Sequence, residues 1–234
     1  MKVLIVDDDK EIVELLNIYL QKEGYETEKA YDGEEALEKV KADEAIRLVI
    51  LDLMMPKKDG MATVQALRQF SSIPVIMLTA KSTDMNKIQG LIAGADDYVT
   101  KPFNPLEVMA RVKSMLRRVE LSQQSEEKEE ENSESPIQVG PLTIKKESHE
   151  VITSSGENIQ LTALEFGILY LLASHPNRVF SADEIFEKVW QQESVVSAKT
   201  VMVHVSHLRD KLEKMTDGEK IIKTVWGVGY KVEA

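Results

Sequence analysis

The chain of 234 residues contains no cysteine, which excludes disulfide bonds, thiol catalysis and cysteine-ligated zinc or iron–sulfur sites. Its apolar stretches are a handful of residues long, far short of the roughly 20 that a membrane-spanning helix needs. The net charge of −11 argues against binding to a polyanion through bulk charge alone. The first residues enter a strand-like run that soon meets aspartate, so no secretory signal is visible. We therefore expect a cytoplasmic protein with no membrane attachment.

One segment of the chain lacks the side chains that a folded core needs. Residues 122–135 contain neither an aromatic nor an apolar side chain, and residues 121–135 carry six glutamates against one lysine. Such a segment cannot bury enough surface to offset the entropy that ordering removes. We therefore predict two domains, at residues 1–120 and 136–234, joined by an acidic flexible linker at residues 121–135.

The first domain alternates short apolar runs with amphipathic stretches. The runs lie at residues 3–7, 26–30, 48–52, 75–79 and 98–101. Three of them are apolar on both faces, as strands covered by helices should be. A strand–helix pattern repeated five times predicts a five-stranded parallel α/β sheet of the doubly wound, flavodoxin-like type.

The second domain has a different pattern. Runs at residues 139–144 and 150–153 predict a small antiparallel sheet, and a capping box formed by Thr162 and Glu165 predicts a helix over 163–174. Further helices are predicted at about 182–190 and 197–213, and Gly227 and Gly229 suit the turn of a C-terminal hairpin. A sheet, three helices and a terminal hairpin are the outline of a winged-helix domain.

Polar side chains follow four of the five strands predicted in the first domain. They are Asp7 and Asp8 after the first strand, Asp52 at the third, Thr79 at the fourth and Lys101 after the fifth. In a doubly wound sheet these positions meet at one edge, where ligands bind. Clustered carboxylates repel one another unless a cation neutralises them, and ligands that offer only oxygen favour Mg²⁺ or Mn²⁺. A lysine and a threonine beside such an ion suit a phosphoryl group, with Asp52 as its acceptor.

The segments that contain these residues resemble the receiver domain of two-component response regulators. The segments are residues 6–9, 51–56, 78–80, 94–98 and 100–103, and the resemblance covers the whole first domain. It implies that a sensor histidine kinase phosphorylates Asp52 from a phosphohistidine. It also implies that Asp8, Asp52 and the backbone carbonyl of Met54 bind the metal ion directly, while Asp7 acts largely through water.

The same resemblance implies the remaining roles at the predicted site. Lys101 would pair with one phosphoryl oxygen, and the Lys101–Pro102 peptide is expected to be cis. Thr79 would turn to hydrogen-bond another phosphoryl oxygen, and Tyr98 would follow it inward as the second switch residue. A half-buried tyrosine with a packing role is the alternative for Tyr98.

The last predicted helix has one apolar and one polar side. The apolar stripe consists of Val201, Val205, Leu208 and Leu212. The opposite side presents Lys199, Thr200, Val203, Ser206 and His207. That side could enter a major groove or could be an ordinary solvated face, and the helix alone does not decide between them. The excess of acidic over basic residues in this domain, 13 against 11, counts against DNA binding.

The sequence of the second domain resembles the winged-helix output domain of the OmpR/PhoB family. The resemblance runs from residue 137 to the end of the chain. It implies that Thr200, Val203 and His207 face bases and that four residues hold phosphates, namely Trp190, Lys199, His204 and Arg209. The predicted hairpin would be the DNA-contacting wing, with Trp226 near its tip.

Two positions depart from the pattern of that family. His207 and Trp226 stand where the family often has arginine. A wing arginine would reach the minor groove, and a tryptophan cannot make that contact in the same way. The wing is in this respect similar to that of VanR-type regulators.

The resemblance also implies how the two domains are coupled. A charged face of the receiver would form a twofold dimer on phosphorylation through intermolecular ion pairs, for which Lys87 with Glu107 and Asp97 with Arg111 are the predicted partners. The predicted face consists of Lys87, Asp96, Asp97, Glu107, Arg111 and Arg118. The dimer would place two output domains on direct repeats of promoter DNA about 10–10.5 bp apart and act with RNA polymerase.

The main prediction is thus a transcription factor that phosphorylation switches, and not an enzyme. A magnesium-dependent phosphatase of the haloacid-dehalogenase type also uses an aspartyl phosphate. It needs a second aspartate two residues after the nucleophile, where this chain has Met54. A constitutive DNA-binding regulator with a non-switching receiver is the other alternative. It would predict gaps in the acidic set, and none is present.

Overall fold

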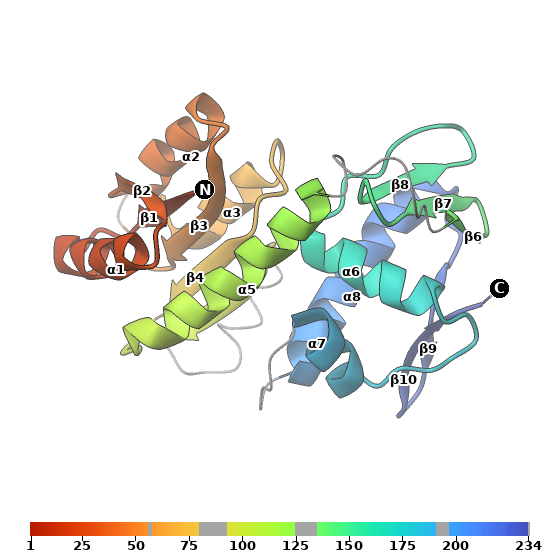
Figure 1. The fold of residues 1–234 in the computed structure, drawn as a ribbon. Coiled ribbons are helices and arrows are strands. Elements are labelled where there is room, and N and C mark those ends of the chain that lie inside the picture. Colours follow the sequence, from red (N-terminus) through yellow and green to blue (C-terminus); the bar gives the residue numbers. More distant parts are fainter. Residues whose placement is uncertain (56–57, 80–92, 125–134, 191–196, 234) are drawn as a thin grey trace. The chain divides into compact units, whose positions relative to one another are not determined.

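The computed structural model describes residues 1–55, 58–79, 93–124, 135–190 and 197–233 (Figure 1). Contacts within the chain divide it into two compact units, Met1–Arg117 and Arg118–Ala234. Within the described parts, no helix is both long and apolar enough to cross a membrane.

The first unit is a five-stranded parallel sheet with the strand order β2-β1-β3-β4-β5. This arrangement confirms the predicted fold class of the first domain. Its strands are β1 (Lys2–Val6), β2 (Glu26–Ala30), β3 (Ile46–Asp52), β4 (Val75–Thr79) and β5 (Asp97–Thr100). Its helices in the described residues are α1 (Lys10–Lys22), α2 (Gly33–Ala42), α3 (Gly60–Leu67) and α5 (Pro105–Gln124).

The sheet is covered on both faces because its central strands are apolar on both sides. Along β1, Val3 and Ile5 belong to a core cluster that includes residues of α1 and α5. Leu4 and Val6 point the other way and belong to a cluster with residues of α2 and α3. Alternate side chains of one strand thus enter two cores, which is the doubly wound arrangement.

The strand order brings the predicted site residues to one edge of the sheet. The chain passes from β1 to β2 on one side and then crosses back to β3 on the other side of β1, so the order reverses between β1 and β3. Asp7 follows β1 directly, and Asp52 is the last residue of the neighbouring β3. A crevice for a ligand forms at such a reversal point.

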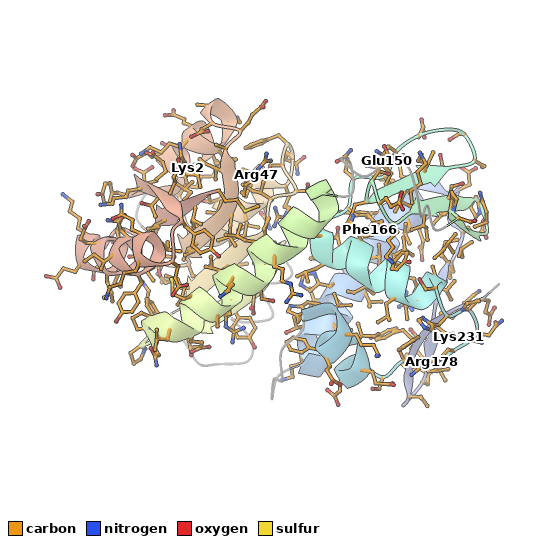
Figure 2. The ribbon with its side chains drawn as sticks, in the orientation of Figure 1. Lys2, Arg47, Glu150, Phe166, Arg178 and Lys231 are labelled. Atoms are coloured by element: carbon orange, nitrogen blue, oxygen red, sulfur yellow. The ribbon has the colours of Figure 1, made fainter. Side chains whose placement is uncertain are left out.

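The second unit confirms the winged-helix prediction. Strands β6 (Ile137–Val139), β7 (Leu142–Lys145) and β8 (Glu150–Thr153) form an antiparallel sheet. Three helices follow, α6 (Ala163–Ala173), α7 (Ala182–Trp190) and α8 (Ser197–Met215). Strands β9 (Ile222–Val225) and β10 (Gly229–Val232) form the terminal hairpin. Side chains from all three helices and both sheets form one core, which includes Phe166 of α6 (Figure 2).

The predicted capping box of α6 is present. The Thr162 hydroxyl accepts a hydrogen bond from the Glu165 backbone N–H, and the Glu165 carboxylate accepts one from the Thr162 backbone N–H. Two donors at the start of the helix are therefore satisfied by neighbouring side chains. Glu165 is also buried and forms an ion pair of 2.6 Å with Lys211 of α8, which ties the first helix of the unit to the last.

The predicted linker begins later than expected. Helix α5 extends to Gln124, so residues 121–124, which the composition placed in the linker, are helical. The acidic residues 125–134 lie outside the described residues, and the prediction of a flexible linker is untested there.

Candidate functional site

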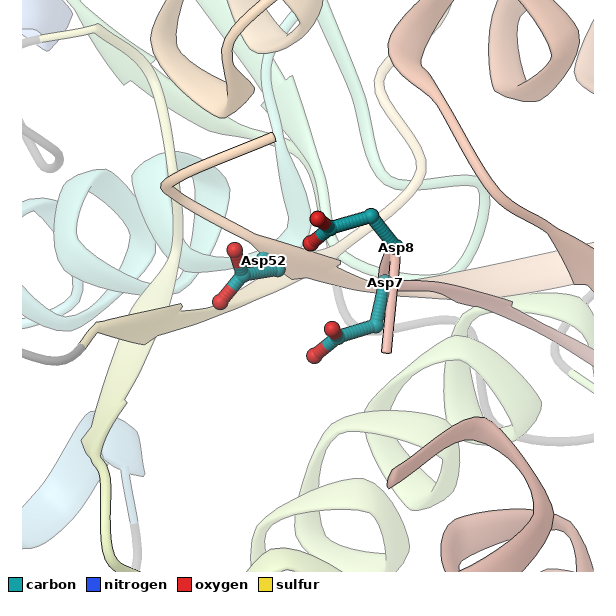
Figure 3. Close-up of side chains that lie close together, drawn as sticks. All are labelled: Asp7, Asp8 and Asp52. Atoms are coloured by element: carbon teal, nitrogen blue, oxygen red, sulfur yellow. The ribbon is translucent and has the colours of Figure 1, made fainter. Parts of the chain in front are cut away.

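Three carboxylates converge at the carboxyl edge of the first sheet (Figure 3). Asp7, Asp8 and Asp52 each offer an oxygen atom, and these atoms lie within 4.8 Å of one another. Asp7 and Asp52 are buried, whereas Asp8 is exposed. The cluster is therefore a partly buried site that solvent reaches from the side of Asp8.

Lys101 provides the positive charge at this site. Its Nζ atom lies 2.6 Å from Asp7 Oδ2 and 2.7 Å from Asp52 Oδ1. Burial by itself lowers the pKa of Lys101, but hydrogen bonds and charge attraction from Asp52 and Asp7 outweigh it, so the pKa is raised. Burial raises the pKa of Asp7, although its bonds to Lys101 and to the backbone act in the opposite direction. Three carboxylates and one ammonium leave a formal charge of −2 when all are ionised.

Backbone N–H groups fix the two buried carboxylates from the other side. Asp52 Oδ2 accepts a hydrogen bond of 2.8 Å from the Met54 N–H, and Asp7 Oδ1 accepts one of 2.9 Å from the Asp9 N–H. Asp9 also caps α1 through its own side chain. The orientation of the Asp52 carboxylate is therefore set by Lys101 at one oxygen and by the turn after β3 at the other.

The ends of β4 and β5 complete the site. Thr79 is buried, and its carbonyl oxygen accepts a hydrogen bond of 2.7 Å from the Lys101 backbone N–H. The Lys101–Pro102 peptide bond is cis, as predicted. Tyr98 is half-buried and packs against the core on the α3 side of the sheet. This placement suits both the packing role and the switch role of Tyr98, so the switch role stays a prediction.

Gly60 is a residue of the site that the sequence reasoning did not identify as functional. Its N–H donates a hydrogen bond of 3.0 Å to the Leu53 carbonyl oxygen. A Cβ atom at Gly60 would lie 2.3 Å from the Asp52 carbonyl oxygen and 2.9 Å from the Leu53 Cα atom. Gly60 thus allows α3 to begin directly against the backbone of Asp52. The signal in the sequence was a glycine at the first position of a helix, directly after the capping residue Asp59.

Asp96, which was predicted to lie on the charged face that binds a second receiver, has a structural role instead. Asp96 is buried, and its Oδ2 accepts hydrogen bonds from Arg68 at 2.7 Å and from the Val75 N–H at 2.8 Å. The expectation that Asp96 faces a partner subunit is therefore wrong for this structure. The Asp96 carboxylate instead joins the end of α3, through Arg68, to the start of β4, through the Val75 N–H.

The predicted pair of Asp97 and Arg111 forms within one chain. The distance between them is 2.6 Å, and Arg111 also pairs with Glu107 at 2.9 Å on the same helix. One turn of α5 separates Arg111 from Glu107, and Asp97 of β5 reaches the same guanidinium group; the intermolecular pair stays a prediction. Lys87 lies outside the described residues, and nothing is described of the Arg118 side chain.

The face of α8 that was predicted to meet DNA is only partly exposed. Lys199 and Ser206 are exposed and His207 is half-buried, but Thr200 and Val203 are 3% and 8% exposed. Thr200 lies beside the apolar stripe, and the buried side of the helix is wider than that stripe. The expectation that Thr200 and Val203 lie on an exposed face is therefore wrong for this structure, and their base contacts stay predictions.

Two of the predicted phosphate contacts lie in the core of the second unit. Trp190 is 1% exposed and His204 is 3% exposed. The Trp190 ring stacks on Phe186 with centroids 4.9 Å apart, and the His204 ring meets it edge-on at 5.2 Å. These rings pack α7 against α8, and their predicted contacts with phosphates stay predictions. Large aromatic side chains such as Trp190 bury much apolar surface and so contribute strongly to the packing of a core.

The last two predicted contacts lie at the hairpin. Trp226 is 91% exposed at the tip between β9 and β10. Arg209 of α8 is half-buried, and its guanidinium group bonds to β9. The hairpin therefore offers the chain's most exposed large apolar side chain among the described residues, beside a helix whose exposed face carries Lys199.

Comparisons with protein families match both units. The family described as the response regulator receiver domain matches residues 3–113. The family described as the C-terminal domain of transcriptional regulatory proteins matches residues 156–232.

Known proteins are similar to this chain over nearly its whole length. The regulatory protein VanRc of Enterococcus gallinarum is 45% identical over 99% of this chain and 98% of its own length. The alkaline phosphatase synthesis transcriptional regulatory protein PhoP of Bacillus subtilis is 42% identical over 99% of this chain and 96% of its own length. A solved structure of a RitR mutant is 24% identical, with a TM-score of 0.77 over 100% of this chain and 99% of that one, which shows the likeness of fold alone.

Proposed function

Because the chain belongs to the OmpR/PhoB family of response regulators, in which a receiver domain precedes a DNA-binding domain, we propose that phosphorylation of Asp52 switches its control of transcription. The observation that carries the proposal is the position of Asp52 at the end of β3. Two further carboxylates lie around it, and Lys101 is at hydrogen-bond distance from one of its oxygens.

The donor set fits Mg²⁺ or Mn²⁺. Asp8, Asp52 and the Met54 carbonyl group would hold the ion, with Asp7 acting through water, and all of these donors are oxygen atoms. A divalent cation would also neutralise the formal charge of −2 that the ionised side chains leave. When bound, the ion supplies positive charge to the phosphoryl oxygens.

The chain's own residues would receive the phosphoryl group as follows. A carboxylate oxygen of Asp52 attacks phosphorus on the phosphohistidine of a sensor kinase, so an O–P bond forms as the P–N bond breaks. The histidine nitrogen leaves with the electron pair of that bond. Lys101 exchanges its carboxylate partners for one phosphoryl oxygen, and the Thr79 hydroxyl donates a hydrogen bond to another. These groups position and neutralise a donor that is already reactive, and Tyr98 follows Thr79 inward.

Phosphorylation would act on DNA through the second unit. The phosphorylated receiver would dimerise and place two winged-helix units on direct repeats of promoter DNA, where they act with RNA polymerase. Lys199, Ser206 and His207 of α8 are accessible for this contact, as is Trp226 at the hairpin. Of the predicted receiver interface, Glu107 is half-exposed on its side chain while it pairs with Arg111, and Lys87 and Arg118 remain predicted members.

The proposal is tested by adding acetyl phosphate and Mg²⁺ to the full-length protein and to its Asp52→Asn variant. Intact mass spectrometry should show one added phosphoryl group on the wild type only, and sedimentation should show a shift from monomer to dimer. Removal of Mg²⁺ with a chelator should abolish both changes. No added mass on a protein that still binds specific DNA would refute the switch and favour the constitutive alternative.

A further inference from the structure

Arg209 joins the last helix of the DNA-binding unit to its hairpin. Its Nε atom donates a hydrogen bond of 3.1 Å to the Ile222 carbonyl oxygen, and Nη2 donates one of 2.7 Å to Thr224 Oγ1. Its guanidinium carbon lies 5.5 Å from the centre of the Tyr230 ring. One side chain of α8 therefore contacts both β9 and β10.

These contacts lie directly below the exposed tip of the hairpin. Thr224 and Tyr230 are paired across the two strands, and Thr224 is two residues before Trp226. The tip is a tight turn in which the Val228 N–H bonds to the Val225 carbonyl oxygen at 3.0 Å, with Gly227 at a φ of 73°. This turn joins Trp226 directly to the two strands, so the place of its ring depends on where the strands below it are held.

The hairpin is also held by contacts that do not involve the Arg209 side chain. Phe180 and Tyr230 exchange two backbone hydrogen bonds of 2.9 Å, and the side chains of Ile222 and Val232 are buried. Loss of Arg209 would therefore leave the hairpin attached but change its position relative to α8. The contacts of Arg209 therefore affect the position of the hairpin tip more than the stability of the fold.

We propose that Arg209 is a positioning residue, which locks the hairpin to α8 and so fixes where Trp226 meets DNA beside the exposed face of that helix. The inference rests on the proposed DNA binding of this unit. It differs from the predicted role of Arg209 as an independent phosphate contact, because Nε and Nη2 bond to β9. An arginine suits this role because its rigid planar fork holds several donors at fixed positions, whereas a lysine carries a single ammonium group on a flexible stem.

DNA is the occupant that the local charges favour. Between Ile221 and Val232 the charged residues are Lys223 and Lys231, with no acid among them, although the whole chain is acidic. Trp226 adds no charge, so it would contribute through contact of its ring with sugar or base atoms. Contacts of this kind fall off within about an ångström, which is why the position of the ring matters.

The first test observes Trp226 without DNA. The chain has two tryptophans, one 91% and the other 1% exposed, so 5-fluorotryptophan labelling should give two distinguishable ¹⁹F resonances. In Arg209→Ala, the Trp226 resonance should narrow, because the tip moves more freely once the hairpin is no longer held to α8. The Trp190 resonance should stay in place, which shows that the core is intact. An unchanged Trp226 resonance would overturn the proposal.

The second test is a double-mutant cycle on binding to a 30-bp duplex, with full-length wild type, Arg209→Ala, Trp226→Ala and the double variant. We expect each single variant to lose affinity by about tenfold, which corresponds to about 1.4 kcal/mol of binding free energy. The double variant should lose little more affinity than the single variant that binds less tightly, because both changes remove the same contact with DNA. Losses that multiply in the double variant would show that Arg209 acts on its own and would overturn the proposal.

Two further variants separate position from charge. Arg209→Lys keeps the charge but not the fork, so it should behave like Arg209→Ala; wild-type affinity in Arg209→Lys would contradict the proposal. Lys199→Ala is the matched control, because it removes a charge from the same helix without touching the hairpin, and its loss should multiply with that of Trp226→Ala. A wild-type protein that binds no duplex would refute the proposed function instead, and the ¹⁹F measurement would still decide the role of Arg209.

Discussion

Replacing Gly60 with alanine should disturb Asp52, the proposed phosphoacceptor, through the backbone. The added Cβ atom would lie 2.3 Å from the Asp52 carbonyl oxygen, whereas ordinary contacts of a Cβ atom begin at 3.4 Å. The first turn of α3 and the end of β3 must therefore separate by about 1 Å, and the neighbouring atoms are main-chain atoms that cannot rotate away.

The size of the effect follows from this displacement. A shift of about 1 Å in a reacting group can lower a rate by about 100-fold, so phosphorylation of Asp52 by acetyl phosphate should slow by roughly that factor. Overpacking of this kind also destabilises a protein by about 1–3 kcal/mol. Without the clash, alanine would be favoured at a helical position by about 0.5–1 kcal/mol, so the sign of the stability change is itself a test.

The assay compares Mg²⁺ affinity, phosphorylation rate and urea unfolding for the wild type, Gly60→Ala and Asp59→Ala. Asp59→Ala is the matched control because it removes the cap of α3, which accepts a bond from the Ala62 N–H, without adding an atom near Asp52. It should lower stability by about 1 kcal/mol and leave the phosphorylation rate near that of the wild type. A Gly60→Ala variant that is more stable than the wild type and is phosphorylated at the normal rate would refute the reasoning.

Three further outcomes are expected. Mg²⁺ at 100 times its dissociation constant should stabilise the protein by about 2.7 kcal/mol in thermal unfolding, and Asp8→Asn should greatly reduce this gain; an equal gain in Asp8→Asn would contradict the assigned ligand set. Burial against Phe166 lowers the pKa of His149, so the unfolded chain binds the proton more tightly, and the unfolding free energy should fall as pH decreases below about 6.5. Urea unfolding should show this fall in the wild type and a smaller one in His149→Asn. Lys211→Met should lower the free energy of unfolding by about 1–2 kcal/mol, because it leaves the buried Glu165 without its cation; this value is reduced for the partial exposure of Lys211. Adding Glu165→Gln to this variant should restore part of the lost stability in urea unfolding.

The sheet and the carboxylate cluster could be predicted because both follow from local patterns. Strands β1, β3 and β4 are apolar on both faces, which only a sheet covered on two sides explains. Once the strands are parallel, their carboxyl ends share an edge, so Asp7, Asp52 and Lys101 had to be neighbours. The helix cap at Thr162 was equally visible, since it needs only residues close in the sequence.

The roles of other residues depend on contacts between distant segments. An acid such as Asp96 looks the same in the sequence whether it faces solvent or Arg68, which precedes it by 28 residues. In α8, the spacing of apolar residues located the stripe but not its width, so the burial of Thr200 and His204 was missed. Arg209 shows the same limit, because its acceptors on β9 become neighbours only when the hairpin folds back on the helix.

The charges at the receiver site indicate why the strands that follow Asp52 should report its phosphorylation. Conversion of the Asp52 carboxylate to an acyl phosphate would add one negative charge to a site that already carries a net negative charge. Thr79 and Lys101 are the donors available for it at the ends of β4 and β5, and the Lys101 N–H is bonded to the Thr79 carbonyl oxygen. We infer that these two strand ends move together. Because β5 also carries Asp97, which pairs with Arg111 of α5, a movement that began at the proposed phosphoryl group would reach α5.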